Sequence, residues 1–254
     1  MKNQIKQIII LLFIIFFKNG FAQCNLSYEK SKAYHVLKVY KTTGDKQLDN
    51  FISSYNTDLI VSFGVSADIR IIDSDNAFAT KFTWPDGVTA NFSLDGAIYL
   101  GKKLLLNEWS KPNGDVIILS IIAHEFAHIL QNKKGTYYSN SKIQELHADY
   151  MAGCFFCTDL SASTDINKKA NDLKKAFGEK GDYAYWSFDH HGTPQERMSA
   201  IYDGIYDVNE AYKNLPMGGI GDPVSESIRT AFYEKGYKKA VDGTFGIRLC
   251  VRAS

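Results

Sequence analysis

The segment with the clearest chemical potential is His124-Glu125-Phe126-Ala127-His128, which has the form H-E-x-x-H. Residues four apart lie on one face of a helix, so the imidazoles of His124 and His128 could bind the same metal ion. Zn²⁺ favours nitrogen ligands, and a catalytic zinc site keeps one position open for water. Glu125 would lie at the edge of such an ion, where its carboxylate could accept a proton from the water. The segment therefore predicts a catalytic zinc centre.

The residues around this segment indicate one buried helix over 116–131, because they are apolar on nearly every side. Asn113-Gly114-Asp115 supplies a helix start, and Gly135 a stop. The alternative is a solvated helix face that carries the motif by chance. Burying two histidines and a glutamate without partners would cost several kcal/mol, and a shared metal ion removes that cost. The apolar surroundings therefore favour the metal site.

We expect the third metal ligand to come from a second helix. The metzincin form of the motif requires glycine at 131 and histidine at 134, whereas this chain has Gln131 and Lys134. Glu145 and Asp149 lie four apart, on one helical face. Glu145 would bind the metal, and Asp149 would accept a hydrogen bond from the free N–H of a ligand histidine.

These two carboxylates have an alternative role as surface groups that pair with Lys142 or with arginines. His147 is a competing ligand, but it lies about 200° around the helix from Glu145, so both side chains cannot face one ion. Close approach of the second helix to the first is favoured by two small residues near the ligand face, Ala148 and Ala152.

The remaining sequence predicts the elements that would position these residues. The apolar spacing over 45–57 predicts an amphipathic helix, and 68–73 and 97–100 are β-prone runs with a turn signal at 84–87 between them. Strands followed by helices favour an α+β fold, in one domain over 23–254. Helices are expected at 116–131, 141–157, 164–177, 193–213 and 224–235.

The first 22 residues read as a secretory signal peptide. Lys2 and Lys6 precede ten apolar residues, Ile8 to Phe17, and small residues precede a cleavage point before Gln23. An uncleaved anchor is the alternative, although a spanning helix needs about 20 apolar residues; lipidation of Cys24 is another. We expect an exported protein, periplasmic or extracellular, without a membrane span after signal removal.

The net charge and the cysteines bear on two further properties, nucleic-acid binding and disulfide formation. The 254 residues include 29 Lys and Arg against 28 Asp and Glu, and this net charge of +1 gives no electrostatic footprint for nucleic acid. Exported cysteines can form disulfides, and a bond between Cys24 and Cys250 would join the two ends of the mature chain. Sequence leaves the connectivity open. Cys154 and Cys157 form a C-x-x-C that we interpret as structural, with a redox role as the alternative.

Taken together, these motifs resemble those of the gluzincin metallopeptidases. The chain is similar to the neutral zinc metallopeptidases and to the CAAX-endopeptidase-like group, in which a helix of the E-x-x-A-D type follows H-E-x-x-H, as residues 145–153 do here. Residues 76–80 and 96–100 resemble the strand region before the zinc helix, and 191–197 (HGTPQER) resembles a block that follows the glutamate helix. The matches span about residues 76–204.

The resemblance implies a zincin-like domain that binds Zn²⁺ through His124, His128 and Glu145, with Glu125 as general base. It implies that 96–100 is an edge strand that pairs with a peptide substrate. It also implies that a catalytic residue, His191 or Arg197, stabilises the oxyanion. His190 is a weaker candidate for the same role. The alternatives are that His191 caps the helix beginning near Thr193 and that Arg197 pairs with Asp149 or Glu196.

These observations predict an exported zinc endopeptidase that acts on peptides or proteins. One rival function is a non-catalytic exported binding protein that keeps a zincin-like metal site for structure. The presence of Glu125 argues against a non-catalytic binding protein, because a purely structural metal site does not need a general base. Another is an interaction module with a tyrosine-rich surface, which has no use for a complete set of metal ligands.

Overall fold

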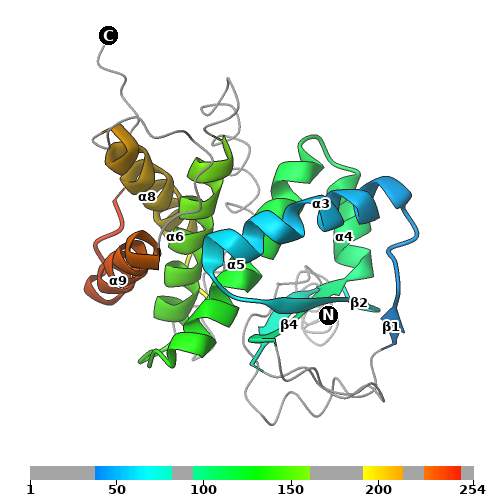
Figure 1. The fold of residues 1–254 in the computed structure, drawn as a ribbon, viewed down its shortest axis with the longest axis horizontal. Helices are drawn as coiled ribbons and strands as arrows, with labels where there is room; N and C mark the ends of the chain where they lie inside the picture. The colour runs from blue at the N-terminus through cyan, green and yellow to red at the C-terminus, as the bar shows by residue number, and fades with distance from the viewer. Residues whose placement is uncertain (1–37, 82–93, 161–190, 214–225, 247–254) are drawn as a thin grey trace, which may run out of the picture.

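The structure is a computed structural model that describes residues 38–81, 94–160, 191–213 and 226–246 (Figure 1). These residues form a mixed α+β fold that is mostly helical, as the sequence predicts. Its elements are β1 (Val39–Tyr40), α3 (Lys46–Phe63), β2 (Ala67–Ile72), β3 (Ala77–Thr80), β4 (Gly96–Gly101), α4 (Lys102–Trp109), α5 (Gly114–Lys134), α6 (Ser141–Leu160), α8 (Pro194–Lys213) and α9 (Glu226–Asp242).

The four strands form one sheet in the order β1-β2-β4-β3. β2 and β4 are parallel, with Ile69 opposite Ile98, whereas β3 and β1 run antiparallel to their neighbours. β4 is therefore a central strand, hydrogen-bonded on both sides. The prediction that 96–100 is the edge strand is wrong, because the chain returns after β3 and inserts β4 between β2 and β3.

α5 is the central helix of the fold. Every residue from 116 to 131 is buried, and α5 contacts β3, β4, α3, α4 and α6. In Figure 1 the sheet and α3 lie on one side of the molecule, and α8 and α9 on the other. The ends of α5 follow the predicted signals, since Asp115 lies in its first turn and Gly135 ends it at φ 63°. The motif therefore lies in the core.

α6 packs against α5 on one side and against α8 and α9 on another. The contact with α8 is close because both helices have a glycine there. A Cβ on Gly153 would lie 2.2 Å from the Ile201 carbonyl oxygen, and one on Gly204 would lie 2.1 Å from the Tyr150 carbonyl oxygen. Both distances are too short for a side chain, so the two backbones can approach only with glycine at both positions.

Local capping explains where the other helices begin. The Asp45 side chain accepts hydrogen bonds from two backbone N–H groups at the start of α3, and α3 continues past the predicted 45–57 because Leu59 and Phe63 are also buried. Thr193 and Glu196 form a reciprocal capping box at the start of α8, at distances of 2.9–3.2 Å. The predicted start at Thr193 is confirmed, and Thr193 rather than His191 is the cap.

Further predictions agree in position but not in every boundary. The helix expected at 141–157 extends to 160, and the one at 224–235 is observed at 226–242. β1 and α4 were not predicted, because both are short and lack a distinct periodicity. Several predicted features lie outside the described residues: the signal peptide 1–22, the turn 84–87, the helix 164–177, His190, Cys24 and Cys250.

Candidate metal centre

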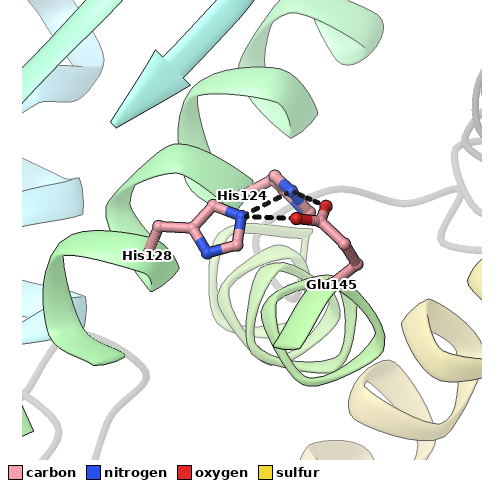
Figure 2. A group of neighbouring side chains, drawn as sticks. All are labelled: His124, His128 and Glu145. Atoms are coloured by element: carbon pink, nitrogen blue, oxygen red, sulfur yellow. Dashed lines mark hydrogen bonds and ion pairs between the residues drawn. The ribbon is translucent and has the colours of Figure 1, made fainter. Parts of the chain in front are cut away.

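Three predicted metal ligands converge between α5 and α6 (Figure 2). The Nε2 atoms of His124 and His128 lie 3.1 Å apart. The Glu145 carboxylate lies 3.1 Å from Nε2 of His124 and 3.5 Å from Nε2 of His128. Ligand atoms about 2.0–2.1 Å from a tetrahedral zinc ion are about 3.3 Å from one another. The spacing of the three groups would therefore allow them to hold one metal ion.

The hydrogen-bond partners of the two imidazoles indicate which ring nitrogens face the centre of the cluster. Nδ1 of His128 lies 2.7 Å from Oε1 of Gln131, and Nδ1 of His124 lies 2.8 Å from the Asp149 carboxylate. Both neighbours are acceptors, so each Nδ1 donates to its neighbour, and each Nε2 faces the Glu145 carboxylate. A buried carboxylate that faces two ring nitrogens is favourable only with a positive charge between them, carried by a proton on a ring nitrogen or by a metal ion.

The pKa shifts in the cluster have the same cause. Burial lowers the pKa of His124, but the Asp149 and Glu145 carboxylates outweigh it and raise this pKa to about 9. Burial raises the pKa of Glu145, but His128 and His124 outweigh it and hold this pKa well below its ordinary value. The site thus attracts positive charge, whether a proton or a metal ion.

Asp149 supports His124 as predicted, and it is itself paired with Arg197. The Arg197 guanidinium donates to both Asp149 oxygens, from Nε at 2.7 Å and from a terminal nitrogen at 2.8 Å. The same side chain lies 4.0 Å from the Glu145 carboxylate. The predicted ion-pair role of Arg197 is therefore confirmed, and its role toward an oxyanion stays a prediction.

Gln131 supports the second histidine, a role that the sequence interpretation missed. Besides contacting Nδ1 of His128, its side-chain N–H donates to the Gln144 carbonyl oxygen at 3.0 Å. In the sequence, Gln131 stands out only because it excludes the metzincin pattern. The available signal was its spacing, because a residue three positions after His128 lies on the same helical face.

Glu125 and His191 are the remaining predicted site residues. Glu125 is buried on the turn of α5 that carries His124. His191 comes from the segment before α8, and its Nδ1 lies 3.7 Å from the Glu145 carboxylate. His191 therefore lies next to the third candidate ligand, and its oxyanion role stays a prediction.

His147 lies away from the ligands, as its helical angle predicts. It is buried against the Tyr233 ring, with ring centroids 4.5 Å apart, and its Nδ1 lies 2.7 Å from the Tyr138 hydroxyl. Burial lowers the pKa of His147 to about 3, so the ring is neutral. The choice of Glu145 over His147 as the residue that faces the histidines is therefore confirmed.

Cys154 and Cys157 are both buried and not joined in a disulfide. Burial raises the pKa of Cys157 to about 12 and that of Cys154 well above its ordinary value. A thiol that remains protonated is a poor nucleophile. The interpretation of this C-x-x-C as structural therefore fits better than a redox role.

Comparison with known proteins gives no match: no family model, curated protein or solved structure matches the chain. Within the described part of the chain, α5 is long and apolar enough to cross a membrane, but 94% of its most apolar stretch is buried inside the fold. That degree of burial is typical of a core helix.

Proposed function

We propose that this protein is an exported zinc-dependent peptidase. The observation that carries the proposal is the convergence of His124, His128 and Glu145 at ligand spacing, beside a buried glutamate, Glu125. A structural zinc site is usually closed by four protein ligands, whereas three are grouped among the residues that the structure describes, a number that would leave one position for water. The order H-E-x-x-H followed by E-x-x-x-D also resembles that of gluzincins.

Each residue has a separate task in this proposal. A bound zinc ion supplies a Lewis acid that polarises a water molecule and the substrate carbonyl. Glu125 accepts the proton from the attacking water and passes it to the leaving amine. Asp149 and Gln131 hold the ligand imidazoles in the tautomer that presents Nε2. His191 or Arg197 stabilises the negative charge that develops on the carbonyl oxygen.

The proposal is tested by Glu125→Gln in the mature protein. We expect the variant to bind one zinc ion, as measured by elemental analysis, and to hydrolyse casein or a peptide library about 10²–10⁴ times more slowly. Activity of the wild type should disappear with a chelator and return with zinc. Glu108→Gln is a matched control, because Glu108 is a buried glutamate on α4 that pairs with Lys111 at 2.9 Å.

Two outcomes would contradict the proposal. If Glu125→Gln cleaves peptides at the wild-type rate, Glu125 is not the general base. If the wild type binds zinc but cleaves no peptide, the alternative of a binding protein with a structural metal site is the better explanation.

A further inference from the structure

Gln131 occupies an unusual position for a buried amide. Its side chain is 1% exposed and lies in the core, yet both ends of the amide are hydrogen-bonded. One end contacts a ligand histidine on its own helix, and the other contacts the backbone of the neighbouring helix. This amide therefore touches both elements that carry the candidate metal ligands.

The hydrogen bonds fix the orientation of the amide. The Gln144 carbonyl can only accept, so the Gln131 group facing it must be the NH₂. The Gln131 oxygen then faces Nδ1 of His128 at 2.7 Å and accepts a hydrogen bond from its N–H. The reverse orientation would place two oxygens against each other. As a result, His128 is held in the tautomer whose Nε2 is free to bind a metal.

The second bond of the amide acts on the other helix. Gln144 directly precedes Glu145, so Gln131 holds the backbone of α6 next to the third ligand. The acceptor for His128 is also neutral, whereas the acceptor for His124 is the Asp149 carboxylate, whose charge Arg197 balances. The two histidines are thus supported in different ways.

We propose that Gln131 is a positioning residue for the metal centre, which sets the tautomer of His128 and holds α6 at ligand distance. This inference rests on the metal site of the proposed function. It does not depend on the reaction, because it concerns how tightly and in what geometry the metal is bound.

The test compares Q131M and Q131E with the wild type, each as the full mature chain. Q131M is similar in size but removes both hydrogen bonds, whereas Q131E keeps an acceptor for His128 and loses the donor to Gln144. Zinc affinity is measured by competition with a chromophoric chelator, and the Tm of the metal-free form is measured separately. Ser120→Ala is the control, because Ser120 is a buried polar residue of α5 bonded to the Ile117 carbonyl oxygen.

We expect Q131M to bind zinc about 10–100 times more weakly than the wild type. Q131E should bind zinc more tightly than Q131M, because it keeps the acceptor for His128, but less tightly than the wild type, because it loses the hydrogen bond to α6; its metal-free form should keep a lowered Tm. The visible spectrum of bound Co²⁺ should change in Q131M, and Ser120→Ala should match the wild type in affinity and spectrum. A purely structural role would lower Tm without changing zinc affinity or the spectrum.

Three results would overturn the inference: wild-type zinc affinity in Q131M, Q131E binding as weakly as Q131M, or a wild type that binds no zinc. The last would also overturn the proposed function. A wild type that binds zinc and cleaves no peptide, with weakened binding in Q131M, would overturn the peptidase proposal and support the role of Gln131.

Discussion

The pair formed by Arg197 and Asp149 allows the sharpest test of how this site is held together. Arg197 is 4% exposed and Asp149 is 0% exposed, and two hydrogen bonds of 2.7 and 2.8 Å join them. Arg197→Met would leave the Asp149 carboxylate buried, with its main cationic partner removed. Removing one partner of a buried ion pair costs about 3–5 kcal/mol. We expect the free energy of unfolding to fall by about that amount.

The assay is urea unfolding of the metal-free protein, followed by circular dichroism. The double variant Arg197→Met with Asp149→Asn should be more stable than Arg197→Met alone, because no buried charge is left uncompensated. The interaction energy from this double-mutant cycle should be about 1–3 kcal/mol. Zinc affinity should fall about 10–100-fold in Arg197→Met, since Asp149 would no longer be held against His124.

A pair of the same chemistry outside the site serves as control. Arg70 and Asp68 lie 2.7 Å apart on β2, but the Asp68 side chain is 32% exposed. Arg70→Met should cost less than about 1 kcal/mol. If Arg197→Met unfolds at the wild-type urea concentration and binds zinc normally while peptide hydrolysis slows, Arg197 acts on the substrate, and its role as the support of Asp149 is refuted.

Two further predictions concern parts of the fold away from the ligands. Burial raises the pKa of Asp207, but hydrogen bonds from Lys239, Lys235 and Tyr150 outweigh burial and lower this pKa overall. The Asp207 carboxylate therefore stabilises the fold above about pH 4, and this stabilisation is lost as the pH falls further. Asp207→Asn should therefore lower the free energy of unfolding, measured by urea titration, by about 2 kcal/mol at pH 7. The free energy of unfolding of this variant should also depend less on pH in the acid range. The buried thiols at 154 and 157 should resist iodoacetamide at pH 8 in the folded protein and react in urea, as followed by mass spectrometry; rapid labelling of the folded form would contradict their burial.

Local spacing was enough to predict much of the candidate site. His124 and His128 are four apart, as are Glu145 and Asp149, and helical geometry alone places each pair on one face. The angle of about 200° around the helix between Glu145 and His147 is likewise a local property, and it keeps both side chains from facing one ion. Gln131 could have been found by the same reasoning, because it follows His128 by three positions.

Contacts between distant segments were not accessible in this way. The sheet order is an example: residues 96–100 read as a strand, but their β-prone composition does not tell an edge strand from one inserted between β2 and β3. The close packing of Gly153 on α8 is another, since a glycine in a helix has the same local signature whether or not a second backbone lies against it.

The sequence by itself determined the type of each candidate ligand, the helices that carry it and the face on which it lies, because these depend on neighbours within one or two helical turns. Only the tertiary structure decided that Asp149 supports His124 while Gln131 supports His128, and that Arg197 balances the charge of Asp149. These pairings join α5, α6 and α8 across the core. They depend on how three helices pack, which no local periodicity specifies.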